Sequence, residues 1–161
     1  MSPWKEKKYI SPEKIEEKIK ELRTFGKKIA TLNGSFDLLH AGHLKMIYEA
    51  SKQGDVLIVA LNSDASIKKY KSPLRPIVSL EHRLEMIAAL EFVDYVTYFD
   101  ETDPIALLEK IKPDVHNNGS EYGENCIEAE VVKKYGGKIH IIQLIPGLST
   151  TKLIEKIKSC V

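Results

Sequence analysis

Two histidines three residues apart, His40 and His43, are the side chains whose type and spacing point most directly to chemistry. They follow a glycine turn at Gly34 and stand at the start of a helical pattern, with Gly42 between them. An imidazole can donate to a phosphate oxygen, and a helix N-terminus adds free backbone N–H groups and partial positive charge. Because Gly42 has no side chain, a nucleotide has room to lie between the two rings. The segment therefore predicts a triphosphate cradle that has no Walker lysine.

A run of hydroxyl side chains before a lysine predicts a second phosphate contact. Ser149, Thr150, Thr151 and Lys152 follow an apolar stretch and a Pro-Gly turn, so the hydroxyls fall at the start of the last helical pattern. Capping of that helix explains one hydroxyl, and it remains the alternative role for Ser149. Three hydroxyls in succession also supply donors for phosphate oxygens.

Other polar residues lie in loops where they could bind anionic or hydroxylated reactants. Lys71 and Arg75 lie in a proline-stiffened loop, and Arg83 lies in the helical pattern that follows it. Asn62 and Asp64 end an apolar stretch, where an amide and a carboxylate could bind hydroxyls of an acceptor. Solvated basic side chains and helix caps are the ordinary alternatives for these residues.

Length and composition restrict the classes of protein. With 161 residues and 43% hydrophobic content, the chain suffices for one ordinary core. Lysine and arginine number 24 against 23 acidic residues, so the overall charge gives no reason to expect nucleic acid or an anionic membrane as partner. The sequence shows no secretory signal and no apolar run of membrane-spanning length, and its two cysteines are isolated. We therefore expect a cytoplasmic protein with reduced thiols.

The elements that must position these residues alternate between strand and helix. Short β-rich runs are separated by helical patterns of roughly ten residues or more; they cover residues 28–32, 55–61, 94–99, 114–117 and 138–144. The runs within 56–61 and 139–142 are nearly continuous in apolar residues, as expected for strands covered on both faces. The pattern predicts an α/β fold, a single Rossmann-like, doubly wound parallel sheet of about five strands.

The first 27 residues are predicted to form a lead-in segment with one helix, followed by the α/β domain over residues 28–161. In the lead-in, Ser11 and Pro12 open a helical pattern whose stripe of Ile15, Ile19 and Leu22 ends at a glycine. In a doubly wound sheet, ligands bind beyond the carboxyl ends of the strands. The loops there, 33–42, 62–79, 118–124 and 145–149, hold most of the unusual side chains.

The motif Gly34-x-Phe36-Asp37-x-x-His40-x-Gly42-His43 resembles the signature of the cytidylyltransferase-like superfamily of nucleotidyltransferases, in which the HxGH motif is quite specific. Further matching segments extend the resemblance over about residues 28–158; they lie at 62–64, 75–77, 81–83 and 149–152. Within the superfamily the chain most resembles the heptose 1-phosphate adenylyltransferases that make ADP-heptose for lipopolysaccharide cores, in a form without the kinase half.

The resemblance implies a role for each matching residue. The implied catalytic residues are His40, His43, Lys45 and Arg83. The implied nucleotide-binding residues are Gly34, Ser35, Phe36, His40, Gly42, His43, Gly119, Glu121, Ser149, Thr150, Thr151 and Lys152. The acceptor-binding residues would be Asp37, Asn62, Asp64, Lys71 and Arg75, although Asp37 could equally fix the loop.

One loop departs from the family pattern. Heptose adenylyltransferases usually read Lys-Gly-Gly-Asp-Tyr where this chain reads Asn118-Gly119-Ser120-Glu121-Tyr122. Asn118 replaces a lysine and so removes one positive charge, while Glu121 lengthens the carboxylate. We expect this loop to alter contacts to the nucleotide or the sugar.

The expected reaction is transfer of AMP from ATP to a sugar 1-phosphate with release of pyrophosphate. The acceptor oxygen is already anionic near neutral pH, so the enzyme needs positioning and charge stabilisation rather than a strong base. Mg²⁺ is expected to bind through the triphosphate, with no metal held by the protein itself. Two alternatives stay open: a CTP-dependent enzyme acting on glycerol 3-phosphate or a similar alcohol phosphate, and a non-catalytic nucleotide sensor. A homodimer is the family expectation.

Overall fold

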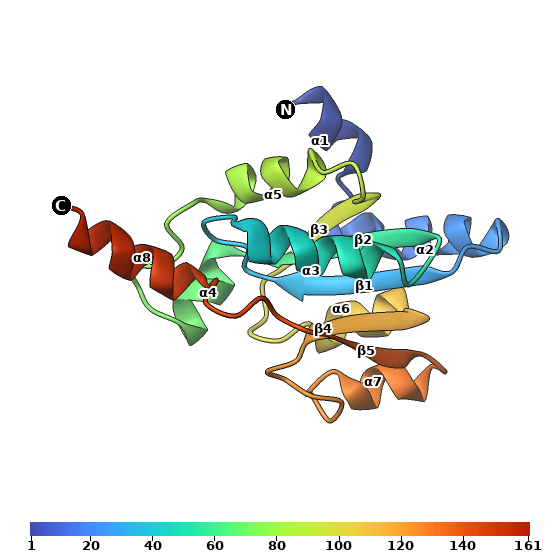
Figure 1. The fold of residues 1–161 in the computed structure, drawn as a ribbon. Coiled ribbons are helices and arrows are strands. Elements are labelled where there is room, and N and C mark those ends of the chain that lie inside the picture. Colours follow the sequence, from blue (N-terminus) through green and yellow to red (C-terminus); the bar gives the residue numbers. More distant parts are fainter.

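The computed structural model describes all 161 residues and contains one five-stranded parallel sheet with helices on both faces (Figure 1). The sheet order is β3-β2-β1-β4-β5, and every neighbouring pair is parallel. The strands are β1 (Ile29–Gly34), β2 (Val56–Asn62), β3 (Tyr95–Phe99), β4 (Val115–Gly119) and β5 (Lys138–Ile142). The predicted fold class is confirmed, and each predicted strand matches an observed one to within two residues at either end.

The central strands are buried on both faces, which explains their unbroken apolar sequence. Every residue of β2 is buried, and its side chains alternate between two cores. Leu57 and Val59 pack with the helices α3 (Ala41–Ser51) and α5 (Leu80–Ala88) on one face, whereas Ile58 packs with α2 (Ile15–Thr24) and α6 (Ile105–Ile111) on the other. Alternation of side chains across a strand with helices on both sides requires apolar residues at every position.

The helices follow the predicted order with two differences. The observed helices are α1 (Pro3–Lys8), η1 (Pro12–Lys14), α2 (Ile15–Thr24), α3 (Ala41–Ser51), α4 (Asp64–Tyr70), α5 (Leu80–Ala88), α6 (Ile105–Ile111), α7 (Ala129–Lys134) and α8 (Thr150–Ser159). The lead-in segment contains α1 in addition to the predicted helix, and α4 forms inside a stretch predicted as loop. The side chain of Ser63 caps α4 by accepting from the backbone N–H of Ser66 at 3.1 Å.

The lead-in helix α2 covers the sheet. Ile15, Ile19 and Leu22 are buried in the core that also contains Ile29 and Ile58 of the strands. The predicted apolar stripe therefore packs within the chain itself. None of the helices is both long enough and apolar enough to cross a membrane.

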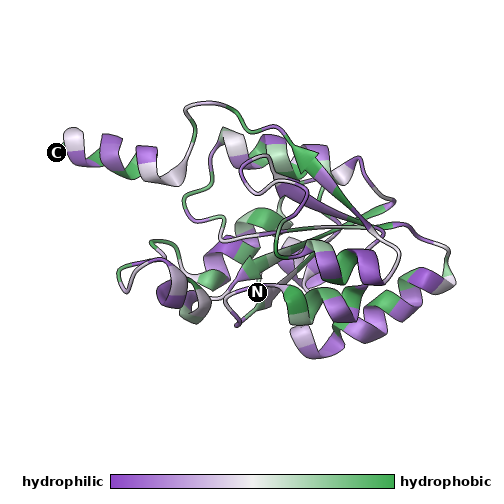
Figure 2. Cartoon of the chain, turned by 90° about the horizontal axis from the view of Figure 1, so that it is seen from below, coloured by the Kyte–Doolittle hydropathy of each residue, from purple (hydrophilic) through white to green (hydrophobic).

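The C-terminal helix α8 extends away from the body of the molecule (Figure 1), and none of its residues is buried. Figure 2 shows the same extension from below, with hydrophilic and hydrophobic residues alternating along the helix. Its first turn is attached to the body, since Thr150 Oγ1 donates to the backbone carbonyl of Asp37 at 2.8 Å.

The strand order reverses direction at β1. The chain moves from β1 to β2 and β3 on one side, then crosses to β4 and β5 on the other. Loops leaving the carboxyl ends of β1 and β4 diverge at such a switch point and leave a crevice between them. The loops predicted to carry the site therefore gather at one edge of the sheet.

Candidate functional site

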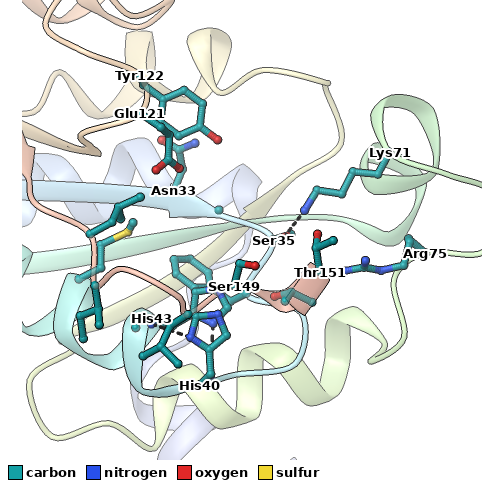
Figure 3. A pocket seen from close by; sticks show the side chains of 18 of the residues that line it. Asn33, Ser35, His40, His43, Lys71, Arg75, Glu121, Tyr122, Ser149 and Thr151 are labelled. Atoms are coloured by element: carbon teal, nitrogen blue, oxygen red, sulfur yellow. Dashed lines mark hydrogen bonds between the residues drawn. The ribbon is translucent and has the colours of Figure 1, made fainter. Parts of the chain in front are cut away.

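A cavity of about 750 Å³ lies at this edge, between the loop after β1, the first turn of α3, the α4–α5 loop, the loop after β4 and the start of α8 (Figure 3). Its lining includes both histidines, Lys71, Arg75, Glu121 and the hydroxyl run at the start of α8. Segments from four distant parts of the sequence thus converge on one space, as the strand order predicts.

The loop after β1 turns sharply to bring the histidines under the cavity. Phe36 and Leu38 have φ values of 48° and 53°, the left-handed region that non-glycine residues seldom adopt. A Cβ added at Gly34 would lie 3.1 Å from the Phe36 ring, so the turn packs tightly on itself. Phe36 is buried and meets His43 edge to face, with ring centroids 5.4 Å apart. The ring of Phe36 therefore packs against the ring of His43 and helps to fix its position.

The two histidines cap α3 reciprocally. The backbone N–H of His43 donates to Nδ1 of His40 at 3.3 Å, and the backbone N–H of His40 donates to Nδ1 of His43 at 3.4 Å. The rings stack with centroids 3.7 Å apart. Because each Nδ1 accepts a hydrogen bond, the proton of each neutral ring lies on Nε2.

Neither Nε2 has a partner within the protein. Nε2 of His40 is shielded from solvent and makes no hydrogen bond, and no protein group pairs with Nε2 of His43. A buried polar atom without a partner is costly, so such an atom beside a cavity marks a position where a ligand would supply the missing acceptor. The pair presents two N–H donors for anionic oxygens.

Both rings are neutral near pH 7. Burial, followed by the neighbouring His40 and Lys71, lowers the pKa of His43 to about 4, while Asp37 opposes the shift. Burial also lowers the pKa of His40. The free protein therefore holds hydrogen-bond donors rather than cations at this point, and a bound phosphate would raise both pKa values.

The hydroxyl run has divided roles. Ser149 caps α8, because its Oγ accepts from the backbone N–H of Lys152 at 3.2 Å, and Thr150 is engaged with the carbonyl of Asp37. Thr151 lines the cavity, whereas Lys152 is exposed and outside the lining. Thr151, the helix N-terminus and the O–H of Ser149, which also lines the cavity, thus remain available to a ligand.

Asp37 is a structural junction, the loop-fixing role that the sequence left open beside a contact with the acceptor. Its carboxylate accepts from the backbone N–H groups of Ile77 and Val78 and from Nε of Arg75, all at 2.9 Å. Burial favours a raised pKa for this carboxyl, but the three hydrogen bonds outweigh it and lower the pKa. The side chain of Asp37 is 1% exposed, and the residue does not line the cavity. It holds the α4–α5 loop against the β1 loop.

Arg83, which the resemblance implied as a catalytic residue, forms a buried cross-link in this structure. Its guanidinium donates to the carbonyl oxygens of Val78 (2.9 Å), Ser35 (2.7 Å) and Asn62 (2.9 Å), and to Oδ1 of Asp64 (2.7 Å). Its side chain is 0% exposed, and the residue lines neither cavity. The arginine has no free face for a phosphate in this conformation.

Asp64, predicted at the acceptor, is engaged through one of its carboxylate oxygens. Besides the Arg83 guanidinium, its Oδ1 accepts from the backbone N–H of Leu80 at 2.8 Å, and the residue lies outside both cavities.

The cations that do reach the cavity come from the α4–α5 loop. Lys71 and Arg75 line it, and Nζ of Lys71 donates to Oγ of Ser35 at 3.0 Å (Figure 3). Burial, followed by the nearby Arg75, lowers the pKa of the Lys71 ammonium. Lys45 is exposed on α3 and lines no cavity described here, so the structure does not bring it to the histidines.

A second cavity of about 350 Å³ adjoins the first on the β2 and β3 side. The two share Asn33, Gly34, Ser35, Lys71 and Tyr122 as lining. Asn62 and Asn118 line only the second, whereas Glu121 lines only the first and lies within 3.2 Å of a Cβ position at Gly119. Glu128, which sequence reasoning missed, lines the second cavity although it lies ten residues beyond Asn118.

Comparison with known proteins finds a matching family and similar proteins. The cytidylyltransferase-like family profile matches residues 31–159. The chain is 40% identical over 154 residues to the bifunctional protein HldE of Syntrophotalea carbinolica, covering 92% of this chain and 31% of that protein. It is 45% identical over 141 residues to HldE of Alcanivorax borkumensis, covering 87% and 30% respectively. The chain thus spans less than a third of the length of these relatives.

Solved structures agree in fold. The lipopolysaccharide core biosynthesis protein of Thermoplasma volcanium superposes with a TM-score of 0.60 at 29% identity, covering 74% of this chain and 98% of that one. A pantoate-beta-alanine ligase from Francisella tularensis superposes with a TM-score of 0.62 over 94% of this chain and 77% of its own. At 17% identity, the second likeness concerns the fold alone.

Proposed function

The chain belongs to the cytidylyltransferase-like family, and from that premise we propose that it transfers AMP from ATP to heptose 1-phosphate, giving ADP-heptose and pyrophosphate. The observation that carries this proposal is the histidine pair, whose locked Nδ1 atoms leave two Nε2–H donors without protein partners beside a large cavity. Such donors fit a triphosphate better than a neutral ligand, because they stabilise negative charge.

The reaction needs little from the protein in the way of acid–base chemistry. An anionic oxygen of the acceptor phosphate attacks the α-phosphorus, the new P–O bond forms, and the bond to the β-phosphate oxygen breaks. The electron pair leaves with pyrophosphate, so no side chain has to accept a proton. Catalysis consists of alignment and of stabilising the charge that moves onto the leaving group.

The residues that line the two cavities divide this work. His40 and His43 donate to triphosphate oxygens, and Thr151 and the N-terminus of α8 lie next to them, because Thr150 is bonded to the carbonyl of Asp37 in the same loop. Lys71 lies where the two cavities meet, so its charge reaches both the nucleotide and the approaching acceptor phosphate. Mg²⁺ would be carried by the triphosphate and would neutralise the charge of the phosphates. Glu121 is the carboxylate in the lining of the first cavity that could bind this ion.

The relatives support a sugar acceptor. The name of the Thermoplasma volcanium protein assigns that protein to lipopolysaccharide core biosynthesis. The match to two HldE proteins over about nine tenths of this chain supports the same chemistry. The proposal also places the reaction in the cytoplasm and makes the protein a homodimer. Size-exclusion chromatography with light scattering tests the dimer by measuring the molar mass in solution.

A pyrophosphate-release assay tests the proposal. ATP and CTP are each combined with heptose 1-phosphate and with glycerol 3-phosphate, in the presence of Mg²⁺. The expected result is release with ATP and heptose 1-phosphate at a rate well above the other three combinations. Preference for CTP with glycerol 3-phosphate would replace the proposal by the cytidylyltransferase alternative. Nucleotide binding without release in any combination would favour a sensor.

A further inference from the structure

The second cavity contains a buried carboxylate with little compensation from the protein. Glu128 is 6% exposed and lines this cavity. Its hydrogen bond comes from Nδ2 of Asn118 to Oε2, at 3.2 Å. None of the ion pairs in the chain includes Glu128. Burying a carboxylate without a cation or several donors is costly, so this position calls for a ligand that supplies donors.

The titratable neighbours do not supply the missing charge. His116 is fully buried in β4, and burial lowers its pKa to about 4 although the Glu128 carboxylate opposes the shift, so the imidazole is neutral near pH 7. Cys126 also lies beside the carboxylate, and burial together with Glu128 raises the pKa of its thiol. The neutral imidazole and the thiol therefore leave the Glu128 carboxylate without a positively charged partner.

The rest of the lining is also rich in oxygen acceptors. Oδ1 of Asn33 is shielded from solvent and has no partner, and the amide of Asn62 uses its N–H on Ser66 Oγ, which leaves its oxygen free. The ionised side chains that line this cavity are two carboxylates, Asp103 and Glu128, and one ammonium, Lys71. A second phosphate in this cavity would meet two carboxylates, whereas hydroxyl groups would find acceptors.

We propose that this cavity binds the hydroxyl-bearing body of a singly phosphorylated acceptor, with Glu128 accepting from its hydroxyls and Asn118 positioning the carboxylate. The inference deepens the proposed function and rests on it. The acceptor phosphate lies toward Lys71 and Ser35, which line both cavities, and the body of the acceptor extends from there toward Glu128. Specificity follows from charge: a neutral polyol is accepted, and a second phosphate at the far end is rejected.

The test compares acceptors and one isosteric variant of the full chain. The acceptors are heptose 1-phosphate, the same sugar with a second phosphate at its other end, and a sugar phosphate in which an ammonium replaces one hydroxyl. The unsubstituted enzyme is expected to favour the monophosphate over the bisphosphate by at least about tenfold in kcat/KM. In Glu128→Gln, kcat/KM for the monophosphate falls about tenfold or more through the KM of the acceptor, as expected when a charged hydrogen bond to a hydroxyl is weakened. The KM for ATP stays unchanged, and the preference for one phosphate narrows.

Glu130→Gln is the matched control, because Glu130 is exposed on α7 and lines neither cavity. It is expected to match the unsubstituted enzyme with every acceptor. Equal use of the mono- and bisphosphate by the unsubstituted enzyme would overturn the inference, and this comparison does not depend on how any variant folds. Use of the ammonium acceptor that is unaffected by Glu128→Gln would overturn it as well, because a carboxylate that faces the acceptor must interact with the added positive charge.

Calorimetry separates this inference from the proposed function. If no acceptor yields pyrophosphate, heptose 1-phosphate is titrated into the unsubstituted protein and into Glu128→Gln in the absence of nucleotide. Binding that weakens about tenfold in the variant sustains the cavity assignment while the proposed reaction fails. Binding that is equal in both, or absent from both, overturns the assignment itself.

Discussion

Replacement of Asp37 by asparagine distinguishes the structural role of this residue from the acceptor contact that the motif suggested. Oδ1 accepts from the backbone N–H of Val78, and Oδ2 accepts from Ile77 N–H and Arg75 Nε. An asparagine has one acceptor oxygen, so its NH₂ must face at least one of these donors. Removing one partner of a buried charge pair costs about 3–5 kcal/mol. Because asparagine keeps some hydrogen bonds, we expect a loss of about 2–4 kcal/mol in the free energy of unfolding.

Urea unfolding measures this loss, and amide hydrogen exchange locates it. The amides of Ile77 and Val78 should exchange faster in Asp37→Asn, since they lose their buried acceptor. Asp100→Asn is the control, because Asp100 is exposed and its carboxylate makes no hydrogen bond, and it should change stability by less than about 0.5 kcal/mol. If Asp37→Asn keeps full stability and only raises the KM of the acceptor, the junction described here is wrong and the acceptor role is restored.

Four further substitutions test the remaining assignments. His43→Ala should lower kcat by about 10²–10³ by removing a donor to developing charge, with stability kept within about 1 kcal/mol; near-normal turnover would contradict the mechanism. Gly42→Ala should lower kcat about tenfold, since its Cβ would lie 2.9 Å from Cε1 of His40 and must displace that ring; steady-state kinetics at saturating ATP checks this. Arg83→Met should cost about 3–5 kcal/mol in thermal or urea unfolding by stranding its buried partners, whereas a phosphate ligand would leave stability unchanged. Between about pH 6.5 and 4 the unfolded chain protonates His116 while the folded chain does not, so stability present above pH 6.5 is lost as the pH falls, by about 2 kcal/mol at pH 5. His116→Gln should remove the share of His116 from the slope of the urea-midpoint profile and leave the share of His43, whose pKa is also lowered to about 4; an unchanged slope would place the loss elsewhere.

The fold and the histidine pair of the site were predictable from the sequence, because both depend on residues that are close together in the chain. The unbroken apolar run of β2 requires helices on both faces of the strand, and this requirement needs no knowledge of distant residues. The reciprocal cap of His40 and His43 joins residues three apart, a spacing that helix geometry alone brings together. The capping role of Ser149, left open beside a phosphate role, is equally local.

The roles of the charged residues were decided by tertiary structure alone. Arg83, Asp37 and Asp64 match the family pattern as well as the histidines do, yet their side chains are engaged by groups 5 to 48 positions away. Sequence spacing does not reveal whether a guanidinium or carboxylate will find internal partners or face a cavity, because that depends on how separate loops pack.

The same reason explains why Glu128 was missed. Its position near the start of a helix gives no sign of burial, and only the packing of α7 against β5 and α6 brings it to Asn118 and the second cavity. The sequence by itself determined the sheet, the order of its elements and the histidine motif, through periodicity and short-range geometry. The tertiary structure decided which charges remain free for a ligand, because burial and long-range pairing arise only when the loops meet.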